Sequence, residues 1–509
     1  MSKPLSVDAR LRLASALVMC TLASPAAPAQ VHAYPDGRPW AQRAGSGPDA
    51  EVSGWFYNLG ITGMRVTLDE TAPRELLVKH VFKGSPADGK VRVGDTIIGT
   101  GGRLFESDYR NGYGMDVFGP TGPVLEFAQA LEVTQTKAGK GMLPLVLMRA
   151  GKRIEARVKL GTKHGQFEAS YPAQCEKSED LLEGALDYLV DHQRSDGSWG
   201  STVQDTFAPL ALLASGKKKY RKSVERNVRW HARTTHAVDE SGLINWRYMA
   251  AAIVMSEYYL ATRARWVMEE LQEVYDFLYS SQYMDLSQVN PRSKESHPGS
   301  YPEGPMDAHG GWGHNPGFEG YGPICMLTGQ GALAFALMSH CGIKIDRQRH
   351  EAAYAFLERA TGRNAYVWYA DEAAGHNNWA DMGRTGATGI ANWLSPWDGE
   401  EFRRRAEDHA KVIGLHPESF PDTHASPLMG MGYAAVAASV VDGSFRNLMN
   451  ENRWWFLLSE CDDGSFYYQP NRDNSGYGAD SRIAATAIVA FIFTIPNRSL
   501  RMTQRRDKK

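Results

Sequence analysis

The chain has 509 residues and a formal net charge of -2, because 56 Lys and Arg residues nearly balance 58 Asp and Glu residues. This length suits two or three domains with a sizeable core. The balanced charge excludes the basic footprint that is typical of nucleic-acid binders and of polybasic membrane-surface proteins.

The first residues have the order of a secretory signal. A basic segment ending at Arg12 precedes an apolar run from Leu13 to Ala23, which is short of the ~20 residues that span a bilayer. An uncleaved anchor is the alternative that this length disfavours. The small-x-small triplet Ala27-Pro28-Ala29 predicts cleavage before Gln30, so residues 1–29 are a signal peptide. We therefore expect an exported protein, periplasmic or extracellular, with a flexible leader at 30–51 and no membrane span in the mature chain.

Residues 52–165 predict a small β-rich domain that resembles a PDZ domain. A strand is followed by a Gly-Ser-Pro-Ala turn and a Gly-Asp-x-Ile strand entry, and later by a helix and two closing strands, at 76–81, 84–87, 94–97, 123–130, 143–149 and 154–160. PDZ domains bind a peptide or protein C-terminus, whose carboxylate accepts from the backbone N–H groups of a loop and whose chain adds as a strand. The resemblance assigns that loop to Leu59, Gly60, Ile61, Thr62 and Gly63.

Peptide capture has one competing interpretation at this domain. The loop differs from the usual PDZ loop, and a long insertion at 105–121 could cover the groove. The alternative is a PDZ-like spacer that docks on the rest of its own chain.

Residues 178–502 alternate between two kinds of helix. Striped, charged helices are expected at 180–193, 220–234, 266–282, 347–361, 400–413 and 445–460, and helices that are apolar all round at 207–214, 246–262, 321–340, 384–393, 427–441 and 477–493. Helices that are apolar on every side must be buried, whereas striped helices can face water. Strict alternation of six outer and six inner helices predicts an (α/α)6 toroid, so the expected fold is multidomain, a small β-rich domain followed by an all-α toroid.

One loop resembles the repeats of squalene–hopene cyclases and of prenyltransferase toroids. It runs from Gln193 to Gly200 and reads Gln-Arg-Ser-Asp-Gly-Ser-Trp-Gly. A degenerate copy runs from Glu460 to Phe466. The Asp-Gly pair forms a turn and the aromatic residue packs on the next hairpin, so the motif specifies the fold and no chemistry. The whole arrangement resembles bacterial exported proteins of unknown function that join a PDZ domain to such a toroid.

Terpene chemistry is the weakest functional hypothesis for this toroid. Alkene protonation needs an Asp-x-Asp-Asp acid, which the sequence lacks. The zinc set of protein prenyltransferases and the Cys-Gly-Glu-Gln thioester are absent as well, and the cysteines have no metal-ligand spacing. We expect no metal and no cofactor.

Polar loops precede the last four inner helices, at the end where a toroid opens. They are rich in residues that bind or transform sugars: aromatic rings stack on sugar faces, and Asn, Arg or His neutralises a uronate carboxylate while Tyr or His moves a proton. The candidate catalytic residues are His309, His314, Asn377, Arg384, His424 and Tyr477, and the candidate substrate-binding residues are Trp312, Glu319, Asn378, Trp379, Asp422 and Arg482.

Two functions remain open from the sequence. The first is an exported enzyme that acts on an extracellular polysaccharide, as a lyase or a hydrolase. The second is a non-catalytic scaffold that holds a peptide or protein in the PDZ groove. The choice of polysaccharide rests on analogy with other α/α toroids.

Overall fold

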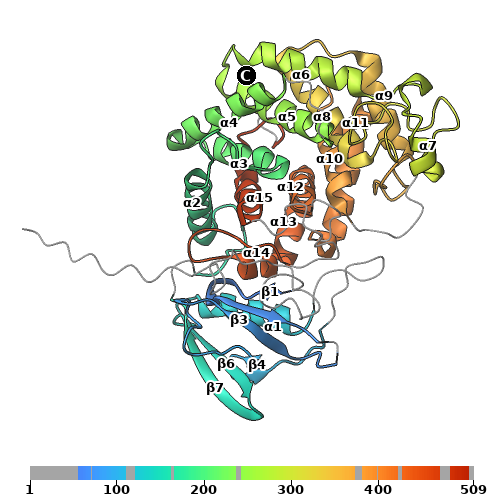
Figure 1. The fold of residues 1–509 in the computed structure, drawn as a ribbon. Coiled ribbons are helices and arrows are strands. Elements are labelled where there is room, and N and C mark those ends of the chain that lie inside the picture. Colours follow the sequence, from blue (N-terminus) through green and yellow to red (C-terminus); the bar gives the residue numbers. More distant parts are fainter. Residues whose placement is uncertain are drawn as a thin grey trace, which may run out of the picture.

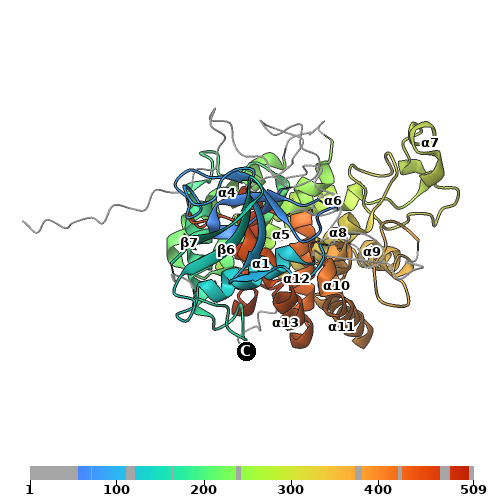
Figure 2. The same cartoon turned by 90° about the horizontal axis from the view of Figure 1, so that it is seen from below.

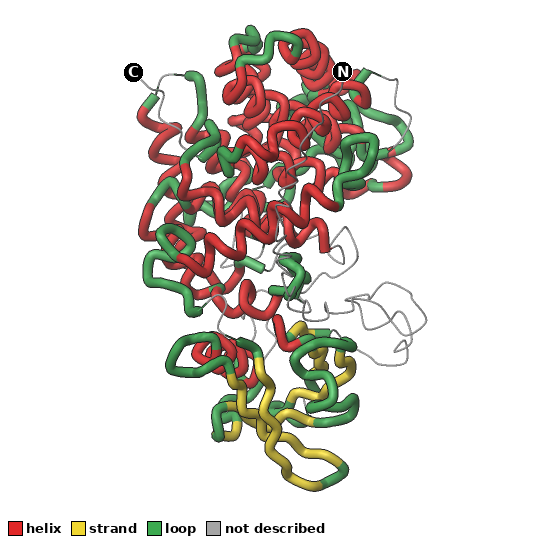
Figure 3. The backbone as a smooth tube through the Cα atoms, turned by 90° about the vertical axis from the view of Figure 1, so that its left-hand side faces the viewer, coloured by secondary structure: helices red, strands yellow, loops and turns green. Residues whose placement is uncertain are grey.

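The computed structural model describes residues 56–69, 71–109, 121–161, 165–236, 242–372, 381–397, 399–421, 427–469 and 482–503. The strands gather at one end of the molecule and the helices form the larger part (Figures 1 and 3). None of the described helices is both long and apolar enough to cross a membrane.

The N-terminal region is an antiparallel sheet with one helix. Its strands in the described residues are β1 (Tyr57–Asn58), β2 (Met64–Thr67), β3 (Leu76–Val81), β4 (Thr96–Thr100), β5 (Arg103–Leu104), β6 (Met142–Arg149) and β7 (Lys152–Lys159). They pair in the order β1-β2-β3-β4-β6-β7, and β5 pairs with β4. Helix α1 (Pro123–Thr134) contacts β4 and β6, and the apolar faces of sheet and helix form the core. The resemblance to a PDZ domain stays a prediction.

The inner helices of the helical region are buried on almost every side. They are α3 (Thr202–Ala214), α5 (Ile244–Thr262), α8 (Cys325–Cys341), α10 (Met382–Trp393), α12 (Pro427–Ala438) and α15 (Arg482–Thr494). Across the described residues these six helices contact one another in sequence, α3 with α5, then α8, α10, α12 and α15, and α15 contacts α3 again. That last contact closes the ring, so the expected (α/α)6 toroid is confirmed.

The outer helices form the more highly charged layer, and each of them contacts inner helices. They are α2 (Glu176–Asp191), α4 (Arg221–Thr234), α6 (Val267–Ser281), α9 (Arg347–Arg359), α11 (Glu400–Leu415) and α13 (Asp442–Glu451), with α14 (Arg453–Ser459) continuing α13 after Asn452. A short helix, α7 (Ser293–Ser296), lies in the loop between α6 and α8 (Figure 2). The predicted alternation of outer and inner helices therefore matches the described helices.

Small residues let the inner helices approach closely. A Cβ on Gly383 of α10 would lie 2.4 Å from the Cα of Gly430 on α12, and one on Gly386 would lie 2.5 Å from the backbone N of Ala434. No side chain fits in those gaps. Glycine at both positions therefore allows the backbones of α10 and α12 to touch and narrows the ring.

Candidate functional site

A cavity of about 440 Å³ opens at the N-terminal ends of the inner helices. Five of the inner helices in the described residues contribute to its wall, each through a residue at or beside its first turn. The lining residues are Ser201, Thr202, Val203, Leu243, Trp246, His314, Tyr321, Ile324, Met326, Tyr369, Asp381, Arg384 and Met429. The cavity therefore lies at the mouth of the toroid, where the polar loops were expected.

His314 is held on the first turn of α5 by backbone contacts. Its carbonyl accepts from the N–H of Asn245 at 3.1 Å, and the side chain of Asn245 donates to the carbonyl of Gly313 at 2.9 Å. Asn245 is fully buried, and Ser281 Oγ donates to its Oδ1 at 2.5 Å. The loop is thereby fixed to α5 and the imidazole of His314 lies in the cavity wall.

A chain of hydrogen bonds runs along this wall. The indole Nε1 of Trp246 donates to His314 Nδ1 at 2.7 Å, and His314 Nε2 contacts the hydroxyl of Tyr321. The hydroxyl of Tyr369 donates to the same Tyr321 oxygen at 3.2 Å. An indole N–H can only donate, so Nδ1 of His314 must be the acceptor and Nε2 carries the proton.

The geometry of this chain determines how its members are protonated. Burial lowers the pKa of His314, which agrees with a neutral ring whose Nδ1 faces a donor. Burial raises the pKa of Tyr369 well above its usual value, so Tyr369 keeps its proton. Tyr321 Oη therefore receives two donors, from His314 and Tyr369, an arrangement that stabilises negative charge arising on that oxygen during a reaction.

Asp381 and Arg384 form a buried ion pair in the cavity wall, at the start of α10. Arg384 Nη1 lies 2.9 Å from Asp381 Oδ2, and Nη2 donates to the hydroxyl of Tyr366 at 2.9 Å. Burial is the largest single influence and lowers the pKa of Arg384, but the carboxylate of Asp381 together with Tyr366 and Cys325 raises that pKa above its ordinary value. Asp381 and Arg384 are the charged residues among the described lining of the cavity, and they neutralise each other.

Of the candidate residues that the structure describes, His314 and Arg384 line the cavity and the others lie elsewhere. Trp312 is fully buried and its indole donates to the carbonyl of Leu278 at 2.9 Å, so it packs in the core of the ring. His309 bonds the carbonyl of Met284 at 2.7 Å through Nδ1, and Glu319 is exposed. The predicted roles of these three residues in the cavity lack geometric support.

Arg482 belongs to a different contact. It pairs with Asp463 at 3.0 Å and lies over the ring of Tyr467, which faces the N-terminal region. Six more candidates lie outside the described residues: Asn377, Asn378, Trp379, Asp422, His424 and Tyr477.

The sequence did not indicate Trp246, Tyr321, Tyr369 or Asp381 as functional residues. The sequence pattern predicts only that Trp246 and Tyr321 begin inner helices. Three of the four lie within four residues of the first residue of an inner helix, namely Trp246 on α5, Tyr321 before α8 and Asp381 before α10. That position, rather than residue type, is the signal that could have found them.

The predicted peptide-binding loop faces the helical region. Leu59, Gly60 and Thr62 are buried, Ile61 is half-buried, and a Cβ on Gly60 would lie 2.4 Å from the carbonyl oxygen of Leu457 on α14. Strand β2 pairs with β3 along one edge. Along its other edge, Arg65 and Val66 of β2 pair with β1. At those residues no edge of β2 is open to an added strand, and helix α14 covers the loop.

The contact between the two regions is buried and polar as well as apolar. Gln469 Oε1 accepts from the N–H of Asn58 at 3.2 Å, and the carbonyl of Tyr468 accepts from Asn58 Nδ2 at 3.1 Å. The guanidinium of Arg65 lies between two rings, 4.4 Å from the centroid of Phe82 and 4.2 Å from that of Tyr467. These contacts favour the docked-spacer alternative over capture of a free peptide.

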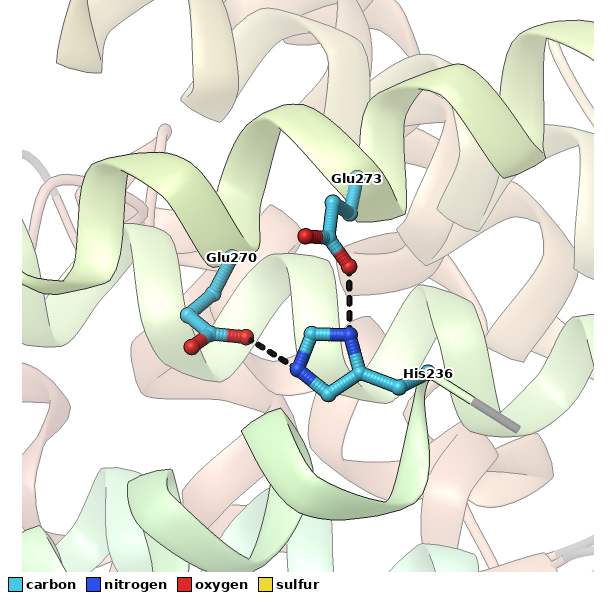
Figure 4. A group of neighbouring side chains, drawn as sticks. All are labelled: His236, Glu270 and Glu273. Atoms are coloured by element: carbon cyan, nitrogen blue, oxygen red, sulfur yellow. Dashed lines mark ion pairs between the residues drawn. The ribbon is translucent and has the colours of Figure 1, made fainter.

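One group of side chains has the composition of a metal site. His236 lies between Glu270 and Glu273 of α6 (Figure 4), with Nε2 2.9 Å from Glu270 Oε2 and Nδ1 against Glu273 Oε2. Each carboxylate faces a different ring nitrogen, so the two do not converge with one nitrogen on a common point. Both contacts lie within ion-pair distance, and we assign no metal to the group.

The chain is similar to several solved structures, among them these three. An inactive variant of the α-1,6-mannanase GH76A of Salegentibacter sp. HEL1_6, in complex with α-1,6-mannotriose, is 11% identical with a TM-score of 0.42, and the match covers 62% of this chain and 98% of that one. A second structure of that mannanase is 11% identical with a TM-score of 0.43, over 61% and 98% of the two chains. A family 76 glycoside hydrolase from a bovine Bacteroides thetaiotaomicron strain is 11% identical with a TM-score of 0.44, over 70% and 84%.

The search of curated proteins found no match to this chain. Residues 178–504 match the family described as a domain of unknown function, DUF6288. This match spans the whole helical ring, including the loops and helix ends that form the cavity. The chain therefore belongs to the DUF6288 family.

Proposed function

We propose that this protein binds a carbohydrate chain in the cavity at the mouth of its toroid and transforms it by proton transfer at Tyr321. The observation that carries the proposal is the hydrogen-bonded chain from Trp246 through His314 to Tyr321, with Tyr369 as a second donor to the same oxygen. This chain fixes the phenol at the cavity wall, where it can give or take a proton.

The composition of the wall supports a sugar as the ligand. Aromatic rings of Trp246, Tyr321 and Tyr369 offer flat apolar faces, and the paired charges of Asp381 and Arg384 offer directed hydrogen-bonding groups. Sugars present both surfaces, because their C–H faces stack on aromatic rings and their hydroxyls bond to polar groups. The cavity is large enough for part of a sugar chain and opens at one end of the ring.

The chemistry of the reaction follows from which groups are present. Hydrolysis by two carboxylates needs a pair about 5 to 10 Å apart across the bond that breaks. Asp381 is the carboxylate among the described lining residues, and it pairs with Arg384. The described residues thus supply a proton-transfer group more completely than a carboxylate pair, which favours a lyase-type elimination from a uronate over hydrolysis. In that step the C5 proton passes to a base, the C4–O bond breaks, the leaving oxygen takes a proton, and a C4–C5 double bond forms.

Product analysis with matched variants tests this function. The protein is incubated with mannan, β-glucan, xylan and polygalacturonate, and both reducing ends and the ultraviolet absorbance of unsaturated ends are measured. With polygalacturonate, the uronate polymer of the set, we expect unsaturated product that Tyr321→Phe lowers by about 100-fold or more, since a general acid or base contributes about 10²–10⁴. Tyr279→Phe, a half-buried tyrosine on outer helix α6, should keep wild-type activity. Equal activity of Tyr321→Phe and wild type would contradict the role of Tyr321.

We also propose that the protein acts outside the cytoplasm. The support is the signal-like order of residues 1–29, which lie outside the described residues. N-terminal sequencing of the protein recovered from its native host should begin at Gln30, and a chain that still begins at Met1 would contradict export by cleavage.

A further inference from the structure

Asp381 carries a carboxylate oxygen that the protein itself leaves without a partner. The residue is 3% exposed and lines the cavity. Its Oδ2 contacts Arg384, but its Oδ1 is buried and has no hydrogen-bond partner among the residues that the structure describes. A buried acceptor without a donor is costly, so such an oxygen calls for a donor from the cavity.

Helix capping does not explain why the Asp381 carboxylate lies in the cavity wall. Asp381 precedes α10 with φ 59° and ψ 58°, in the left-handed region, and its side chain makes no capping bond to the helix. A left-handed conformation at a residue other than glycine costs about 1 kcal/mol or more and recurs at ligand sites. The chain here accepts strain at a lining residue whose carboxylate pairs with Arg384.

Arg384 fixes both the position and the charge of the carboxylate. The guanidinium is held by the hydroxyl of Tyr366 at 2.9 Å and lies 5.5 Å from the ring centroid of Tyr369. Since the positive charge of Arg384 already balances Asp381, the free oxygen requires no second cation. A neutral O–H donor satisfies Oδ1 without adding net charge to a buried site.

From this geometry we infer that Asp381 Oδ1 accepts a hydrogen bond from one hydroxyl of the bound sugar and thereby selects the sugar for which that hydroxyl is in place. The inference rests on the proposed carbohydrate function, and it assigns a specificity-determining role to a residue that lines the same cavity as Tyr321 and Tyr369. A hydrogen bond to a charged acceptor of this kind changes affinity by about 10- to 100-fold.

Binding measurements on matched variants provide the first test. α-1,6-Mannotriose, cellotetraose, xylotetraose and tetragalacturonate are titrated into the full chain, and the best binder is then titrated into Asp381→Asn and Asp95→Asn. Asp95 has a side chain 2% exposed and pairs with Arg149 at 2.6 Å in the N-terminal sheet, so it matches Asp381 in burial and pairing but lies outside the cavity. We expect about 10-fold or greater weakening for Asp381→Asn and less than 2-fold for Asp95→Asn.

Monodeoxy analogues of the same sugar separate a direct contact from a structural effect. Wild type should lose about 10-fold or more in affinity for one deoxy analogue, and Asp381→Asn should bind that analogue and the parent sugar equally. If wild type binds the parent sugar and Asp381→Asn discriminates every analogue as wild type does, the role of Asp381 is overturned while the carbohydrate function stands. If wild type binds none of the four sugars, both proposals are overturned.

Discussion

At the scale of single residues, the indole N–H of Trp246, which can only donate, determines which nitrogen of His314 carries the proton. Trp246 donates to His314 Nδ1, which leaves Nε2 as the only nitrogen that can carry a proton toward Tyr321. Protonation of Nδ1 would place two N–H groups against each other. The neutral state of His314 therefore results from burial together with the orientation of a tryptophan on the adjacent helix.

Substitution of Trp246 tests this dependence. In Trp246→Phe the donor to Nδ1 is lost, so we expect the pKa of His314 to rise from its lowered value toward the ordinary one and both tautomers to become populated. Imidazole nitrogen NMR as a function of pH measures both quantities in the absence of substrate. Trp230→Phe is the control, because Trp230 contacts the ring of His231 instead. An unchanged tautomer in Trp246→Phe would remove Trp246 from this role.

At the scale of elements, helix α14 joins the two regions. It contacts β1, α1 and the turn at Gly60–Thr62, and Arg453 at its first position lies 3.5 Å from Glu132 of α1. The close approach depends on glycine, because Gly60 has φ +60° and its Cα faces the carbonyl of Leu457. Docking thus requires a residue that lacks a side chain and tolerates the left-handed region.

Gly60→Ala should loosen this docking. Its Cβ would lie 2.4 Å from Leu457 O, so α14 or the turn must shift, in addition to the backbone strain of about 1 kcal/mol. Gly89→Ala is the matched control, since Gly89 also has a positive φ of +72° but nothing lies within 4 Å of its added Cβ. Hydrogen exchange of the α14 amides should accelerate in Gly60→Ala alone. Equal protection of the α14 amides in both variants would show that the contact between Gly60 and Leu457 does not determine how tightly α14 is docked.

The helices were predictable because their patterns are local, and the site was less so. An all-round apolar segment such as α8 must be buried, whereas the charged face of α11 must meet water, and both facts can be seen in the sequence. The loop from 309 to 314 is different. Gly310 has a φ of +91°, and after this turn Trp312 packs inward against Leu278 while His314 lies at the cavity. Trp312 and His314 are only two positions apart in an irregular loop, and the sequence does not show which of the two side chains lies at the cavity.

At the scale of the whole molecule, buried histidines join outer helices to inner helices and, in one case, to the loop between α9 and α10. His231 of α4, His350 of α9 and His409 of α11 each bond a backbone carbonyl, of Asp205, Ala332 and Ala365. Burial lowers their pKa values to about 4, about 3 and about 4. Each ring is therefore neutral in the folded protein near neutral pH, with one nitrogen donating to a carbonyl.

Because of these histidines, we predict that the free energy of unfolding of the toroid falls in acid. Below pH 6.5 the unfolded chain binds protons at these sites and the folded chain does not, so the stability present above pH 6.5 is lost as the pH falls toward 4. Each histidine adds about 1.4 kcal/mol per pH unit to that loss. Urea unfolding between pH 7 and pH 5 measures the slope, and His350→Gln should reduce it by about 1 kcal/mol per pH unit, because the unfolded imidazole is only partly protonated at the upper end of this range. A slope that is the same in His350→Gln and wild type would contradict the assignment.

The central claim is that the cavity at the mouth of the toroid is a carbohydrate site. The most direct test is a crystal structure of the protein with the tightest-binding oligosaccharide. We predict a sugar ring against Trp246, Tyr321 or Tyr369, with one hydroxyl at Asp381 Oδ1. An ordered sugar bound only outside this cavity, with all of these side chains free of contact, would contradict the account.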